Sequence, residues 1–169
     1  MDTKRVIEII ETAFLDVPRA EISLRQFVLT DKKGMSGEIT DEEWESAGKD
    51  RVDSRWEEIP DDEIIECDCL LAHMEAQEFR YFLPAYMRFS LKNIAKPAHK
   101  NMILGSTIFC LTPSTKYPDM YVYTVQQLSL LDDKQKSAVR AFLKCMVELA
   151  NVYGKRDAEL ALKKYWQTN

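Results

Sequence analysis

The chain has few of the residues that break regular structure or carry out chemistry. It contains five glycines, six prolines and two histidines in 169 residues. This low glycine and proline content, together with 46% hydrophobic residues, is typical of a globular protein and excludes a disordered or collagen-like chain. The length fits one domain with a sizeable core, so we expect a single globular helical domain over residues 1–169.

Long hydrophobic runs are also absent. No stretch approaches the roughly 20 apolar residues that span a bilayer. The first fourteen residues, MDTKRVIEIIETAF, mix charged with apolar residues and lack the apolar block of a signal peptide. The sequence therefore predicts a cytoplasmic protein without a membrane segment. The net charge of −5 and the dispersed bases disfavour nucleic acid as a partner.

Known catalytic and metal-binding motifs are missing. There is no G-x-S-x-G, no phosphate-binding loop and no H-E-x-x-H. Cys67 and Cys69 are spaced C-x-C, and His73 would share a helical face with Cys69, but two such ligands do not complete a zinc site. We expect reduced, buried cysteines, with Cys69 and His73 in the interior or at its edge. The sequence predicts no catalytic residue, no metal, no cofactor and no enzymatic activity.

The most distinctive feature that is present is an acidic segment, residues 38–68. Its 31 residues hold fourteen acids and three bases, a net charge of −11, whereas the rest of the chain carries +6. Large apolar residues, including Trp44 and Trp56, lie among the acids. Helix capping accounts for four or five of the acids, and the surplus repels itself unless it serves another purpose.

A negative surface with aromatic anchors is suited to attracting a basic protein partner. We expect Trp56 to be the better anchor, because it lies between charged neighbours in a predicted loop. The alternative is that the segment is a solvated surface with two core tryptophans. The candidate partner-binding residues are Glu42, Trp44, Glu45, Asp50, Asp53, Trp56, Glu57, Glu58, Asp61 and Asp62.

Helical periodicity and capping patterns cover most of the chain. An apolar stripe from Val6 to Phe14 predicts the first helix. Thr40 with Glu43, and Asp132 with Gln135, form capping boxes that begin two more helices, the second running to about Tyr153. In that last helix we expect a central position and a buried core segment. Its predicted core residues are Phe142, Leu143 and Met146.

Other segments are less clear from their patterns. Residues 61–95 read as almost entirely helical, with a kink or junction at Pro84 and inward-facing Phe82 and Tyr86. A break near His73–Glu75 is an alternative. Residues 22–30 could be a strand or an extended loop, and 103–111 and 121–125 could be strand or helix. Gly154 is placed to end a helix. The predicted fold class is mainly α, a single-domain helical fold with at most a small β element.

Three sequence pieces together resemble a family of small bacterial domains of unknown function. They are Trp56 with its acidic approach to a helix, Phe79–Met87 (FRYFLPAYM), and Leu131-x-x-x-Gln135 leading to Ala138-Val139-x-x-Phe142-Leu143. The family pattern is similar to W…FRYYLPAYM…LTxxQxxAVxxFL and would span about residues 5–145. The resemblance implies a mainly helical single domain. Asp132 stands where a capping Thr or Ser is usual in the family and still supplies a cap.

These observations favour a non-enzymatic protein-binding domain. The leading specific interpretation is a bacterial immunity protein, or antitoxin, whose acidic surface neutralises a cationic toxin. The alternative is a regulatory or adaptor domain, which could be a homodimer and would need its acids only for solubility. An enzyme of unknown type is the third interpretation.

Overall fold

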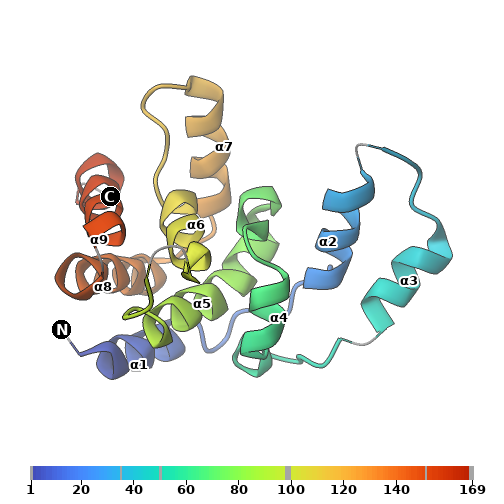
Figure 1. The fold of residues 1–169 in the computed structure, drawn as a ribbon, viewed down its shortest axis with the longest axis horizontal. Helices are drawn as coiled ribbons and strands as arrows, with labels where there is room; N and C mark the ends of the chain where they lie inside the picture. Colours follow the sequence, from blue (N-terminus) through green and yellow to red (C-terminus); the bar gives the residue numbers. More distant parts are fainter. Residues whose placement is uncertain (1, 35, 50, 98–99, 151, 168–169) are drawn as a thin grey trace.

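Helices are the regular structure of the described part of the chain, which comprises residues 2–34, 36–49, 51–97, 100–150 and 152–167 of a computed structural model (Figure 1). No strand occurs in these residues, which confirms the predicted mainly α fold. The helices are α1 (Thr3–Ala13), α2 (Leu24–Lys33), α3 (Asp41–Lys49), α4 (Asp61–Glu66), α5 (Ala76–Lys92), α6 (Met102–Cys110), α7 (Pro118–Leu128), α8 (Asp133–Leu149) and α9 (Val152–Ala161). Shorter turns are η1 (Trp56–Glu58), η2 (Leu70–His73) and the π-helical η4 (Leu162–Trp166).

The core is built around α5. This helix contacts α1, α4, α6, α7, η1 and η2, and its residues 81–91 are all buried. Phe82 and Tyr86 face inward as predicted. The helix runs through Pro84 without being divided, so the predicted junction does not occur. We expected the long C-terminal helix to be central, but α8 packs against α1, α9 and η4 instead.

Helix ends follow the predicted capping chemistry where a box was recognised. Asp132 accepts a 2.9 Å hydrogen bond from the backbone N–H of Gln135, and the Gln135 side chain returns a bond to Asp132. Helix α8 then buries Phe142, Leu143 and Met146, as predicted. It ends at Leu149, four residues before the expected end. Gly154 does not end a helix, because it lies inside α9.

The three ambiguous segments are helical. Residues 22–30 contribute most of α2, which begins with a capping box that sequence reasoning missed: Ser23 Oγ accepts from the N–H of Gln26, whose side chain accepts from the Ser23 N–H. Residues 103–111 fall in and just after α6, and 121–125 fall in α7. None of the described helices has the length and apolar character needed to cross a bilayer.

Two surface elements differ most from the compact centre. Helix α3 has no buried residue, packs mainly against α2 and lies at one end of the molecule in Figure 1. Helix α7 projects from the other helices with its N-terminal end outermost (Figure 1). Residues 117–122 at that end are all exposed.

Candidate functional site

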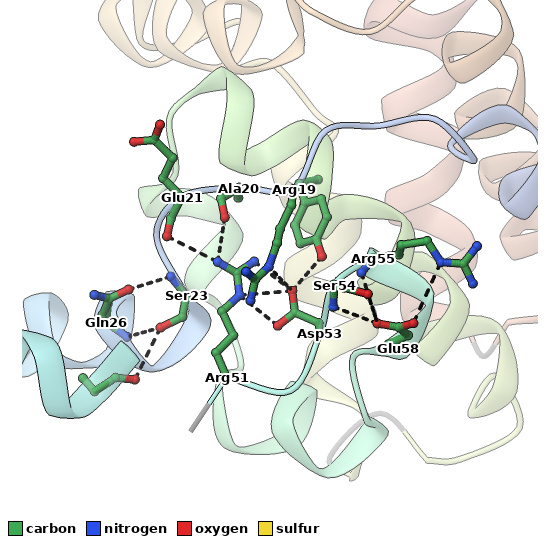
Figure 2. Close-up of polar contacts among 12 residues, drawn as sticks. Arg19, Ala20, Glu21, Ser23, Gln26, Arg51, Asp53, Ser54, Arg55 and Glu58 are labelled. Carbon is green, nitrogen blue, oxygen red and sulfur yellow. Dashed lines mark hydrogen bonds and ion pairs between the residues drawn. The ribbon is translucent and has the colours of Figure 1, made fainter. Parts of the chain in front are cut away.

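The acidic segment is tied to the rest of the protein by a buried ion pair. Asp53 is only 4% exposed, and its carboxylate accepts hydrogen bonds from Arg51 at 2.8–3.1 Å (Figure 2). Tyr81 on α5 donates to the same carboxylate at 2.6 Å. Arg19 lies 3.7 Å away. Burial alone would raise the pKa of Asp53, but hydrogen bonds from Arg51 and Tyr81 lower it below the usual value.

Arg51 also joins the segment to the loop before α2. Its Nη1 donates to the carbonyl of Ala20 at 2.6 Å and to that of Glu21 at 3.3 Å. Its guanidinium lies 5.7 Å from the ring centre of Tyr81. The predicted position of Asp53 on the surface is therefore wrong. Its carboxylate is buried and paired with Arg51, so it is not available to a partner.

Trp56 is a core residue, so its predicted role as an exposed anchor is also wrong. It is 1% exposed, and its indole N–H donates a 2.9 Å hydrogen bond to the carbonyl of Phe14. The guanidinium of Arg88 lies 5.4 Å from the indole ring and donates to the carbonyls of Glu57 and Ile59. These contacts fix η1 against α1 and α5, because the large apolar ring and its donor both find partners in the interior.

Four other acids of the segment, Glu43, Glu58, Asp61 and Glu66, also have side-chain partners within the described residues. Glu58 accepts from the N–H and hydroxyl of Ser54, both at 2.7 Å, and these bonds lower its pKa. Lys92 of α5 lies 3.1 Å from Asp61. The remaining cross-links are Glu43 with Lys33, and Glu66 with Arg25 at 3.2 Å. Four acids, Glu43, Asp53, Asp61 and Glu66, thus pair with basic residues of α2, α5 and the loop between α1 and α2.

Glu63 is the acid with the least favourable surroundings. It is 8% exposed, on the inner side of α4. Burial raises its pKa, and the nearby carboxylates of Asp53 and Asp62 add to the effect, while Arg25 and Arg51 oppose it. The inward position is not a feature of a solvated acidic face.

The exposed remainder of the candidate surface lies mainly on α3. Glu42 and Glu45 are exposed there, and Trp44 between them is half-buried. Asp62 is exposed at the start of α4, and Glu57 is half-buried in η1. Asp50 lies outside the described residues. The structure therefore brings Glu42, Trp44 and Glu45 together on one short helix and separates them from the buried Asp53 and Trp56.

Thr40 begins α3 as the sequence predicts. Its hydroxyl accepts from the N–H of Glu43 at 3.2 Å, and the Glu43 carboxylate accepts from the Thr40 N–H at 3.1 Å. The ion pair with Lys33 attaches Glu43 to α2 and lowers its pKa. Within the described residues, Glu38, Asp41, Glu42 and Glu45 form no ion pair.

Three of the four cysteines are buried as predicted, whereas Cys69 and His73 are exposed. Cys67, Cys110 and Cys145 are buried free thiols, and burial raises the pKa of Cys67 and of Cys110 to about 12. Cys69 is exposed with a left-handed φ of 62°, and His73 is exposed as well, so their predicted interior placement is wrong. The described residues contain no group of three His, Cys, Asp or Glu side chains that could hold a metal.

A groove of about 510 Å³ between α6, α7 and α9 is a feature that sequence reasoning missed. Apolar side chains dominate its wall. The large exposed ones are Phe109, Tyr117, Met120 and Leu160. For Met120 the sequence offers one signal, the four consecutive apolar residues Met120–Tyr123, which cannot all face one buried side of a helix.

One family model matches almost the whole chain. The DUF6714 family, described as a family of unknown function, matches residues 2–169, so the chain belongs to this family. The match extends past both ends of the span expected from the resemblance. No curated protein and no solved structure matches the chain.

Proposed function

We propose that the protein is a non-enzymatic protein-binding domain that uses α3 to dock a basic partner. The observation that carries this proposal is the pair of exposed acids on an outlying helix. Glu42 and Glu45 lie three residues apart on one face of α3 and form no ion pair within the described residues, and the half-buried Trp44 lies on the same helix. Exposed acids on one outlying helix give that surface a negative field, which attracts a cationic partner.

A bacterial immunity protein is the particular case that we favour. In such a complex the acids of α3 would steer a cationic toxin, and the partly exposed indole of Trp44 would supply the apolar contact. The binding surface in this proposal is smaller than residues 38–68, because Asp53 and Trp56 serve the interior. A regulatory or adaptor role remains the second candidate, supported by the separate apolar groove at α7.

The test is capture of a partner with matched baits. We would compare the wild-type protein, Glu42→Lys/Glu45→Lys, and the control Asp16→Lys/Glu159→Lys, which makes the same charge change at exposed sites away from α3. The expected result is a basic protein retained by the wild type and the control and lost from the α3 variant. Retention by all three baits, with thermal unfolding unchanged, would refute docking on α3.

A further inference from the structure

The exposed apolar side chains of the protein gather around one groove. Thirteen large hydrophobic residues are exposed in the described chain, and eight of them belong to α6, α9 or the start of α7. These eight are Met102, Phe109, Tyr117, Met120, Tyr121, Val122, Tyr153 and Leu160. Phe109 is 64% exposed and Met120 is 45% exposed. A concentration of exposed Tyr, Phe and Met on neighbouring helices is the composition of an interface.

The uncharged polar side chains that α7 contributes to the groove wall are already hydrogen-bonded inside the protein. Tyr123 donates to the carbonyl of Ala72 at 3.0 Å, and Gln127 donates to the carbonyl of Leu71 at 2.9 Å and to that of Met74 at 2.6 Å. Thr124 donates to its own helix. The groove therefore offers apolar area with few hydrogen-bonding groups. Its specificity for a bound molecule must come from its shape and from the charges at its rim.

Two opposite charges stand at that rim. Asp157 and Lys164 of the C-terminal helical segment both line the groove, and neither has an ion pair within the described residues. In a two-fold dimer the same surface patch of both subunits forms the interface. Any contact between two different residues across the interface therefore occurs twice. Such a contact can pair Asp157 with Lys164 twice.

The same chain also supplies a projection to fill the groove. The outer end of α7 carries Tyr117, Met120, Tyr121 and Val122 as exposed apolar side chains, and residues of α7 line one side of the groove. A small ligand inside the groove would leave Tyr121 and Val122 uncovered, because they do not line it. A protein surface would cover them, and the burial of that area would stabilise the contact.

We propose that the α6–α7–α9 groove is the interface of a two-fold homodimer. The outer end of α7 from each copy enters the groove of the other, and Asp157 of each copy pairs with Lys164 of its partner. This surface is distinct from α3, so the dimer and the docking of a basic protein stand or fall separately.

The test is sedimentation velocity of the full chain from low micromolar to several hundred micromolar, with a reductant to keep the exposed Cys69 from cross-linking. The wild type should be a dimer. Asp157→Lys alone and Lys164→Glu alone should each weaken the dimer by about tenfold, because each places like charges together at two symmetric positions. Met120→Glu should also weaken it, through the apolar contact.

A mixture of the two rim variants gives the most decisive test of the proposed pairing between Asp157 and Lys164. Equal amounts of Asp157→Lys and Lys164→Glu should restore association as a heterodimer, since every rim contact between the two variants is then attractive. Glu159→Lys and Lys163→Glu make the same charge changes on the same segment outside the groove lining and should leave the dimer intact. A wild type that stays monomeric throughout would overturn the proposal. A dimer indifferent to both rim reversals would overturn it equally.

Discussion

The hydroxyl of Tyr81 on α5 donates a 2.6 Å hydrogen bond to the carboxylate of Asp53, 28 residues earlier in the chain. This bond attaches the acidic segment to α5, and the ion pair between Asp53 and Arg51 stabilises the attachment. We expect Asp53→Asn to lower the free energy of unfolding by about 3 kcal/mol at neutral pH, because it leaves a buried guanidinium without its counter-charge. Urea unfolding checks this, with Glu42→Gln, an exposed acid, as the control that should change little.

The same carboxylate predicts a pH dependence. The pKa of Asp53 in the folded protein is lowered, so its stabilising contribution is fully present above the unfolded value of about 3.9 and is lost as pH falls through the folded value. Asp53→Asn should therefore flatten the fall of stability on acidification. A variant whose acid limb has the same slope as that of the wild type would show that the ion pair contributes nothing there.

Glu63 should behave in the opposite way. Burial raises its pKa, so the ionised folded form is disfavoured and the loss of stability appears as pH rises through the folded pKa. We expect Glu63→Gln to increase the free energy of unfolding by on the order of 1 kcal/mol at pH 7, with the gain vanishing near pH 4. Denaturant unfolding at the two pH values measures it, and equal effects at both would be inconsistent with a titrating buried acid.

Trp56 should govern stability and leave binding to α3 unaffected in the folded protein. Replacing it with Ala removes a 1% exposed side chain and should cost about 3–5 kcal/mol. Trp56→Phe keeps most of the packing but loses the bond to the Phe14 carbonyl, and should cost about 1 kcal/mol. Thermal unfolding distinguishes these values. Unfolding curves that match the wild type for both variants would contradict a core role.

Gly105 offers a stabilising change at the groove. It lies in α6, and a Cβ built on it meets nothing within 4 Å. Gly105→Ala should raise the free energy of unfolding by roughly 0.5–1 kcal/mol, because alanine restricts the unfolded chain and fits the helix. Urea unfolding tests this, with destabilisation as the outcome that would show the groove wall to be closely packed.

The sequence carries enough information for the fold class and the capped helices but not for the placement of every element. Asp132 with Gln135 and Thr40 with Glu43 act locally, so their boxes were recognisable. Residues 22–30 looked strand-like because their apolar and β-branched composition outweighed the Ser23–Gln26 box, although that box fixes the helix start.

The binding surface is harder to predict, because the sequence gives the number of acids but not the groups that each acid contacts in the folded protein. From the sequence, Asp53, Glu58 and Asp61 are expected to be free surface charges. In the fold they contact Tyr81, Ser54 and Lys92, respectively. Charge reversal at Glu57, Glu58, Asp61 and Asp62 is the variant that the charge count alone suggests. The contacts of Glu58 and Asp61 instead predict a loss of stability, so α3 is the cleaner place for a test.

The central claim is that the free acids of α3 steer a basic partner. Its most direct measurement is the association rate of the captured partner with Glu42→Lys/Glu45→Lys and with the control Asp16→Lys/Glu159→Lys, at low and at high salt. We expect the α3 variant to associate roughly tenfold more slowly at low salt and to show a flatter salt dependence, with the control close to the wild type. Equal rates for the two variants at every salt concentration would contradict the claim.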